Sequence, residues 1–89
     1  MNIAEAKIGD VLIQGGHPGH AVIIVDEVED SQTGNRLFLL AQSYMPAQEV
    51  QILNNPNNQA ISPWYQLQEG TIRTPEWTFY SSDLRRFEE

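Results

Sequence analysis

The chain has no cysteine, few basic residues and no long apolar run, and each of these absences excludes a class of function. Without cysteine, the chain holds no disulfide, no thiolate zinc site and no cysteine nucleophile. Five Lys and Arg against 12 Asp and Glu give a net charge of -7, the wrong sign for binding a phosphate backbone, so nucleic acid is not expected as a partner. No apolar run approaches the roughly 20 residues that cross a bilayer, and the N-terminus lacks the basic-then-apolar order of a signal peptide.

What is present is enough for one small domain. The chain has 89 residues, and two cores within that length would each be too small for independent stability. Hydrophobic residues make up 40% of the sequence and gather in short runs, so the chain is expected to fold rather than remain disordered. We therefore expect residues 1–89 to form a single β domain.

Short apolar runs separated by turn residues predict a mainly β fold. The runs are too short for helices and rich in branched residues. Strands are expected at 10–14, 20–30, 36–44 and 48–53, with further β-prone stretches at 71–74 and 77–80. Turn residues at 31–35 separate the second and third strands by hairpin distance, so these two should pair antiparallel.

Two further local patterns refine this fold class. The continuously apolar run 21–25 predicts a central strand that begins buried on both faces. Ser62 is a good helix N-cap and Pro63 fits the first helical position, which predicts a single helical turn over 62–66. The predicted architecture is a small antiparallel sheet or open barrel with at most one short helical turn.

The loop 15–20 holds the densest cluster of special residues, namely three glycines and the only two histidines, His17 and His20. Glycines let a backbone approach a ligand or turn sharply. Two imidazoles need further ligands to hold a metal, and the carboxylates at 26–30 should lie at the far end of a strand. No metal site and no cofactor are therefore expected, and His17 is interpreted as an exposed loop histidine.

His20 is the stronger candidate, because it opens the most buried predicted strand. An imidazole in such a position can act as a base near neutral pH, although a histidine satisfied by a backbone carbonyl is the alternative. On the partner strand, Gln42 interrupts an apolar run, and a buried amide needs a hydrogen-bond partner. A contact between His20 and Gln42 across adjacent strands would satisfy both side chains.

Several stretches resemble known families. IGDVLI at 8–13 followed by GHAVIIV at 19–25 resembles a signature of NlpC-like and CHAP-like papain-fold cysteine hydrolases. More closely, the chain resembles the C-terminal half of a bacterial domain family of unknown function that is frequent in Bacteroidetes. The stretches that carry this second resemblance are 14–26, 39–48, 63–65 and 74–79, which include GGHPGHA and AQSYMPAQ.

The resemblance implies a mechanism as well as a fold. In papain-like hydrolases a cysteine at a helix start attacks a carbonyl, a histidine on the next strand deprotonates it, and a polar residue on the adjacent strand orients the histidine. By resemblance, His20 is the base, Gln42 is the orienting residue and Asp10 has a structural role in the turn before the first strand. The chain would then be the β-half, a C-terminal portion of a larger papain-like α+β domain. No catalysis is expected from it alone, because it has no cysteine and all five serines follow His20.

Three functional hypotheses follow. The first is the β-half of an amidase- or peptidase-type hydrolase, inert alone, with an apolar sheet face where helices would pack and with self-association as the consequence. The second is a non-catalytic module that binds a glycan or peptide in a groove at His20 and Gln42. Its candidate ligand-binding residues are His17, Gly19, Tyr44 and Trp64, with Tyr65 and Trp77 nearby, although core packing is the favoured interpretation of the aromatics. The third, a metal-dependent hydrolase, is disfavoured by its ligand count.

The partner that the resemblance implies is a peptide or a cell-wall glycopeptide. Related hydrolases act on cell-wall peptides, so the analogy places the complete protein outside the cytoplasm. The sequence of this chain carries no signal that fixes its compartment.

Overall fold

The computed structural model describes residues 2–16, 19–44 and 49–86, and these residues form a mainly β fold. The strands are β1 (Val11–Gln14), β2 (His20–Glu29), β3 (Arg36–Tyr44), β4 (Glu49–Ile52), β5 (Trp64–Tyr65), β6 (Thr71–Arg73), β7 (Thr78–Tyr80) and β8 (Leu84–Arg85). Single turns of 3-10 helix occur at Ile3–Glu5 and Ser81–Asp83. The predicted fold class is confirmed, and the sheet does not close into a barrel.

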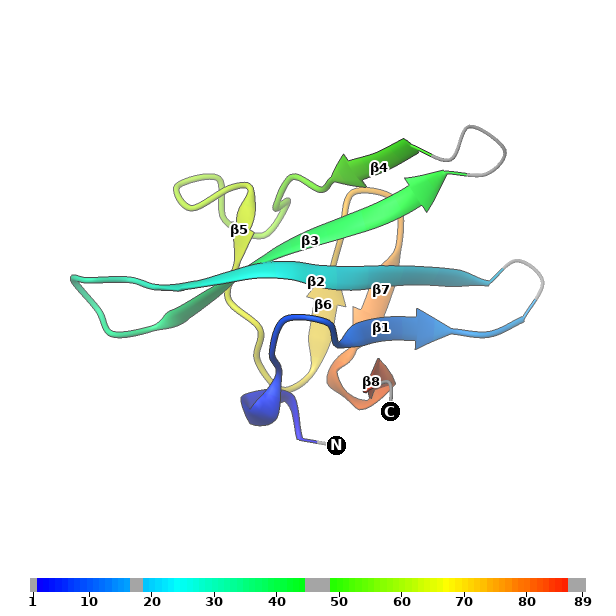
Figure 1. Ribbon diagram of the computed structural model, residues 1–89, viewed down its shortest axis with the longest axis horizontal. Coiled ribbons are helices and arrows are strands. Elements are labelled where there is room, and N and C mark those ends of the chain that lie inside the picture. The colour runs from blue at the N-terminus through cyan, green and yellow to red at the C-terminus, as the bar shows by residue number, and fades with distance from the viewer. Residues whose placement is uncertain (1, 17–18, 45–48, 87–89) are drawn as a thin grey trace.

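Six strands form one antiparallel sheet in the order β4-β3-β2-β1-β8, with β5 paired to β3 beside β4 (Figure 1). The remaining strands, β6 and β7, form a separate antiparallel hairpin that lies against one face of this sheet. The predicted strands at 20–30, 36–44 and 48–53 are present as β2, β3 and β4. The predicted antiparallel pairing of β2 with β3 is confirmed, and β3 also pairs with β4. Most strand pairs therefore join strands that are consecutive in the sequence.

The core lies between the sheet and the β6–β7 hairpin. Alternate side chains of the central strands point to this side, because successive residues of a strand face opposite ways. The sheet supplies Leu12, Val22, Ile24, Phe38 and Leu40, and the hairpin supplies Ile72 and Phe79, all of them buried. The hairpin thus gives the sheet the second layer that a stable domain requires.

The opposite side of the sheet, here called the outer face, leaves several apolar side chains exposed. Strand pairing places on it Val11, Ile13, Ile23, Leu39, Ala41, Ile52 and Trp64. Ile13, Ile23 and Ile52 are 45%, 37% and 44% exposed, whereas Val11 and Ala41 on the same face are buried. β2 is central, as predicted, but the prediction that it begins buried on both faces is wrong. Its burial alternates over residues 20–24, because within the described residues the β6–β7 hairpin covers one face of the strand and leaves Ala21 and Ile23 on the other face exposed.

The predicted helical turn at 62–66 is also wrong. Trp64 and Tyr65 form strand β5 and pair with Leu39 and Phe38 of β3. The Ser62 hydroxyl accepts a hydrogen bond from the backbone N–H of Asn55 at 2.9 Å rather than capping a helix, and the peptide bond before Pro63 is cis. Pairing with β3 satisfies this backbone in a way that a single isolated turn could not.

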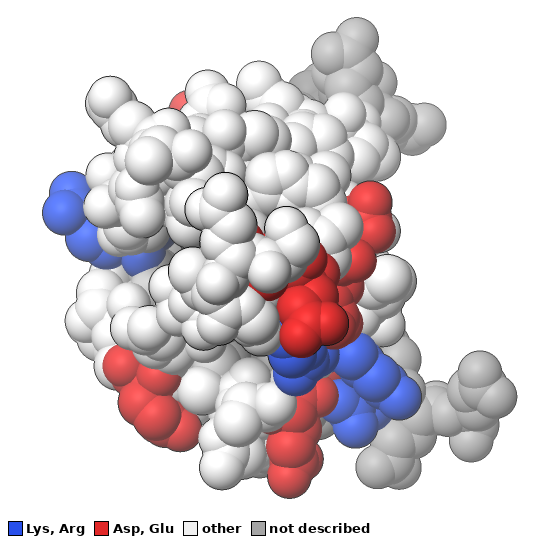
Figure 2. Space-filling model, turned by 90° about the vertical axis from the view of Figure 1, so that its left-hand side faces the viewer, with Lys and Arg blue, Asp and Glu red and all other residues white. Residues whose placement is uncertain are grey.

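Two ion pairs join segments of the chain: one links the turn before β1 to the residue after β8, and the other links β2 to β3. Asp10, 1% exposed, receives two hydrogen bonds from the Arg86 guanidinium at 2.8 and 2.9 Å and one from the Lys7 backbone N–H at 3.0 Å. Arg36 bonds Glu27 in the same fork-like manner, at 2.8 and 3.0 Å. Figure 2, which looks at the end of the molecule where the β2–β3 turn projects, shows acidic groups adjoining basic ones amid uncharged surface. Asp10 therefore has the structural role that the resemblance implied.

Among the described residues, no helix is long and apolar enough to cross a membrane.

Candidate functional site

His20 and Gln42 meet on the covered side of the sheet. His20 is the first residue of β2, and the register that pairs Ile23 with Ala41 puts Gln42 diagonally across from it on the same face. The imidazole Nε2 lies 2.7 Å from the carboxamide Oε1 of Gln42. This confirms the contact that the sequence predicts between the two side chains.

The hydrogen bond assigns the proton on the imidazole. A carboxamide oxygen only accepts, so in the neutral ring this contact requires the tautomer with the proton on Nε2 and the lone pair on Nδ1. Gln42 is 5% exposed, and its burial fixes the direction from which the ring is held. Within the described residues Nδ1 makes no hydrogen bond, so it is the ring atom available to accept a proton.

Two aromatic side chains of the β6–β7 hairpin pack on the imidazole. The Trp77 ring stacks on it with centroids 5.2 Å apart and an interplanar angle of 22°. The buried Phe79 ring lies 5.9 Å away at 31°. Together with Gln42 they hold the plane of the His20 ring, because rotation about its side-chain bonds would drive it into one of the two neighbouring rings.

Trp77 is itself held in place by Gln14, the last residue of β1. The indole Nε1 donates to Gln14 Oε1 at 2.9 Å, and Gln14 Nε2 donates to Asp83 Oδ2 at 2.8 Å and to the Thr78 carbonyl at 3.2 Å. Gln14 also sits directly opposite His20 in the β1–β2 pairing. A continuous chain of contacts thus runs from Asp83 through Gln14 and Trp77 to His20.

Sequence reasoning did not identify Gln14 and Asp83. Gln14 is the polar residue that ends an apolar strand, which is a weak signal that its side chain needs a partner. Its partners lie 63 and 69 residues away, however, and nothing in the sequence links them.

Trp64 does not join this site. It pairs with Leu39 of β3, an odd-numbered position whose side chain points away from Gln42, so Trp64 belongs to the outer face. Tyr65 faces the core and is 1% exposed, and its hydroxyl donates to the Asn54 carbonyl. Burial raises the pKa of Tyr65 to about 12, so the hydroxyl remains a donor at neutral pH. Among Trp64, Tyr65 and Trp77, only Trp77 contacts the His20 ring.

The other predicted ligand-binding residues are placed as follows. Gly19 immediately precedes His20, and a Cβ built on it would lie 3.0 Å from the Gln14 carbonyl oxygen, so close backbone packing already accounts for a glycine there. Tyr44 ends β3, and its side chain lies outside the described part of the structure. His17 also lies outside the described residues. Among the residues that are described, no three His, Cys, Asp or Glu side chains gather as metal ligands would.

Comparison with known proteins extends this description only to the family level. A family model described as "Domain of unknown function (4846)" matches residues 1–86. Comparisons with curated proteins and with solved structures found no significant match.

Proposed function

We propose that this chain, which belongs to the family described as domain of unknown function (4846), is the base-bearing β-half of a papain-like hydrolase of the amidase or peptidase type. His20 is the general base and Gln42 the residue that orients it. The observation that carries the proposal is the 2.7 Å contact from His20 Nε2 to Gln42 Oε1, which makes Nδ1 the basic atom of the neutral ring.

The proposed chemistry needs a thiol from outside this chain. Nδ1 takes the proton of a cysteine thiol, the thiolate attacks the amide carbonyl carbon, and the proton passes to the leaving amine as the C–N bond breaks. Water then releases the acyl group by the reverse proton transfers. Throughout, Gln42 holds the Nε2 proton and thereby stabilises the imidazolium. The 89-residue chain has no cysteine and is proposed to be inert alone.

The surroundings of the imidazole support this role. Trp77 covers one face of the ring, and in a site with less water a hydrogen bond such as that of His20 with Gln42 is electrostatically stronger. Because Asp83 and Gln14 fix the indole, the ring is held before any substrate arrives, which is how catalytic groups are kept in a productive geometry. The substrate proposed from the resemblance is a peptide or a cell-wall glycopeptide.

The outer face supports a partial domain. A sheet face with side chains such as Ile13, Ile23 and Ile52 exposed is an interaction surface in soluble proteins. In the proposed hydrolase, further segments of the larger protein cover this face, whereas the thiol reaches His20 on the opposite, covered side of the sheet. For the chain alone, the proposed consequence is self-association.

The test of catalysis uses the natural gene product that contains these residues, assayed on peptide and cell-wall glycopeptide amides. We expect hydrolysis that iodoacetamide abolishes and that His20→Ala lowers by about 10²–10⁴-fold in kcat/KM. Gln42→Ala should lower kcat with little change in KM, because Gln42 acts through His20. Gln32→Ala, in the β2–β3 turn, is the matched control. A gene product without a reactive thiol, or full activity in His20→Ala, contradicts the proposal.

The orientation of the ring is tested on the 89-residue chain by long-range proton–nitrogen NMR. We expect neutral His20 to carry its proton on Nε2, and Gln42→Leu to give a mixture of tautomers. If the wild-type ring carries its proton on Nδ1, Gln42 is not its acceptor and the assigned base atom is wrong.

The second proposal is a non-catalytic module that binds a glycan or peptide beside His20. The partly exposed Trp77 ring favours it, because aromatic faces contact sugars and apolar side chains alike. Titration with muramyl dipeptide, followed by tryptophan fluorescence, separates the two proposals. Saturable binding that is lost in Trp77→Ala, without hydrolysis by the natural gene product, supports the binding module over the hydrolase.

A further inference from the structure

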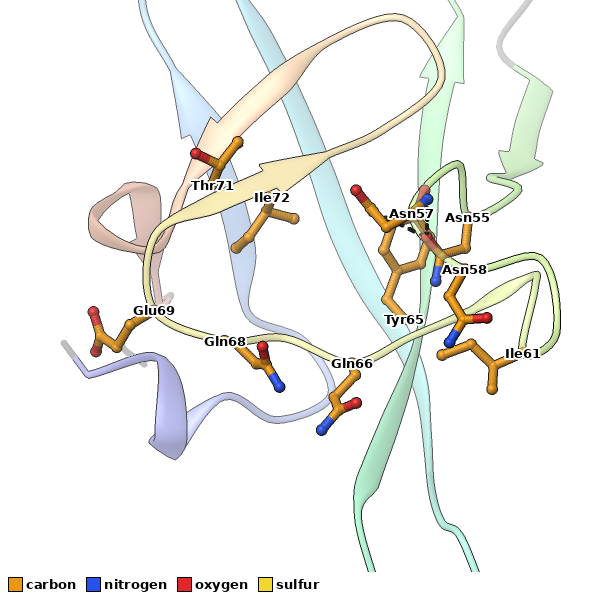
Figure 3. Close-up of a pocket in the computed structure, with 10 residues that line it drawn as sticks. All are labelled: Asn55, Asn57, Asn58, Ile61, Tyr65, Gln66, Gln68, Glu69, Thr71 and Ile72. Atoms are coloured by element: carbon orange, nitrogen blue, oxygen red, sulfur yellow. Dashed lines mark hydrogen bonds between the residues drawn. The ribbon is translucent and has the colours of Figure 1, made fainter. Parts of the chain in front are cut away.

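A hollow lies between the loop 54–61 and the segment 66–72 that leads from β5 into β6. Its volume is about 230 Å³. Figure 3 shows the side chains of the loop and of Tyr65 on one side, and those of the segment 66–72, Ile72 among them, on the other. None of its lining residues belongs to the chain of contacts around His20.

Hydrogen bonds hold the loop side of this hollow in shape. Asn55, 4% exposed, donates from Nδ2 to the Trp64 carbonyl at 2.8 Å. Its Oδ1 accepts from the backbone and side-chain nitrogens of Asn57 at 2.8 and 2.9 Å. Asn57 Nδ2 also donates to the Arg73 carbonyl at 2.9 Å, which ties the loop to the end of β6. A ligand therefore meets a preformed surface and need not order it.

The opposite side offers side-chain groups that the fold does not use. Within the described residues, the carboxamides of Gln66 and Gln68 and the hydroxyl of Thr71 make no hydrogen bond to the protein. On the loop side, the Oδ1 of Asn58 accepts a hydrogen bond from the Ala60 backbone N–H at 3.0 Å, and its Nδ2 has no partner within the described residues. Free donors and acceptors thus surround the hollow.

The chemistry of the lining selects a neutral, hydroxyl-rich ligand. A carboxamide presents a donor and an acceptor on adjacent atoms, which matches neighbouring sugar hydroxyls. The lining has no Lys or Arg and one carboxylate, Glu69, so it offers nothing to an anion such as phosphate. Ile61 provides an apolar wall for the C–H side of a sugar ring. The volume is below the range of drug-sized pockets and suits a single ring.

We propose that this hollow, lined by Asn57, Asn58, Gln66, Gln68 and Glu69, is a binding site for one neutral sugar residue. A ring of that size held by a few neutral hydrogen bonds binds with a Kd of about 1 mM. The site is separate from the His20 centre and does not depend on the hydrolase proposal.

The test is a titration of the ¹⁵N-labelled 89-residue chain with glucose and with N-acetylglucosamine, followed by proton–nitrogen NMR. We expect saturable shifts in the side-chain amide signals of Gln66 and Gln68 with at least one of the two sugars. Gln66→Ala and Gln68→Ala should each weaken binding by about 2–10-fold, the effect of one lost hydrogen bond. Both side chains are exposed, so both variants should fold.

Two controls keep this result distinct from the other proposals. Gln32→Ala removes an exposed glutamine that does not line the hollow, and His20→Ala alters the other centre; both should leave the sugar affinity unchanged. The absence of saturable shifts with either sugar overturns the proposal. So do equal shifts with inorganic phosphate, or a loss of binding in His20→Ala.

Discussion

At the scale of single residues, the buried carboxylate of Asp10 forms an ion pair with Arg86. The Arg86 guanidinium beside it and the Lys7 N–H hold the pKa of Asp10 below its ordinary value of 3.8, against the opposing effect of burial. A group whose pKa is lowered by folding contributes stability that is complete above its unfolded pKa. That contribution is lost as the pH falls through the folded pKa.

Asp10→Asn should therefore destabilise the protein near neutral pH by about 1.5–3 kcal/mol, the range for hydrogen bonds to a charged group. The difference in the free energy of unfolding between wild type and variant should stay constant above about pH 5 and shrink as the pH falls below about 4. Urea titrations from pH 2 to pH 7 measure this difference. Asp26→Asn changes an exposed aspartate and serves as the control. A difference that grows with acidity would contradict the assigned ion pair.

The residue scale also shows how His20 is positioned. Its ring is held by one hydrogen bond, to Gln42, and by the stacked Trp77 ring. The predicted pair of polar residues is therefore one part of a larger arrangement that includes Gln14 and Asp83. Gln14 acts on His20 through its hydrogen bond to Trp77 and from its place opposite His20 on β1, and this makes Gln14 a positioning residue.

At the scale of elements, the β2–β3 hairpin forms the centre of the sheet, because it pairs the two longest strands. Its turn depends on Gly34, whose φ of +74° is a conformation that other residues adopt at a cost. The Gly34 N–H donates to the Asp30 carbonyl at 2.8 Å and closes the turn.

Gly34→Ala should accordingly lower the free energy of unfolding by about 1–2 kcal/mol, the cost of left-handed backbone for a residue with a Cβ. Gly15→Ala is the matched control, since Gly15 has no left-handed φ and an added Cβ would meet nothing within 4 Å. Urea denaturation of both variants gives the comparison. Equal effects at the two positions would show that the turn conformation is not what Gly34 supplies.

At the scale of the whole molecule, the dominant feature is a sheet covered on one side. The β6–β7 hairpin buries one face, while apolar side chains remain exposed on the outer face. Exposed apolar surface of this kind favours association in water. A sheet with one uncovered apolar face is what the proposal of a larger parent domain predicts, because further segments would cover that face.

If the outer face drives association, Ile52→Lys should shift the chain toward monomer in sedimentation velocity runs over a range of protein concentrations. Ile8→Lys is the control, because Ile8 is exposed to a similar extent, 55% against 44%, but lies in the turn before β1. A wild-type chain that stays monomeric at every concentration would contradict the proposed self-association. Equal effects of the two lysines would instead show that the added positive charge, and not its place on the outer face, changes the association.

The sequence by itself determined the local elements and their neighbour pairings. Apolar runs of strand length and the turn residues at 31–35 were enough to predict β2, β3 and their antiparallel pairing, because a hairpin depends on residues close in sequence. The His20–Gln42 contact was predictable for the same reason: both residues lie in that hairpin, and each needs a partner.

Only the tertiary structure decided which surfaces are covered and which distant residues meet. The run 21–25 is apolar throughout, yet burial on both faces needs a second covering layer that no local pattern specifies. Likewise, Ser62 and Pro63 carry a helix-start signal, but pairing of Trp64 and Tyr65 with β3 satisfied that backbone instead. Gln14 reaches Trp77 and Asp83 across more than sixty residues of chain, and such contacts are set by packing rather than by sequence spacing.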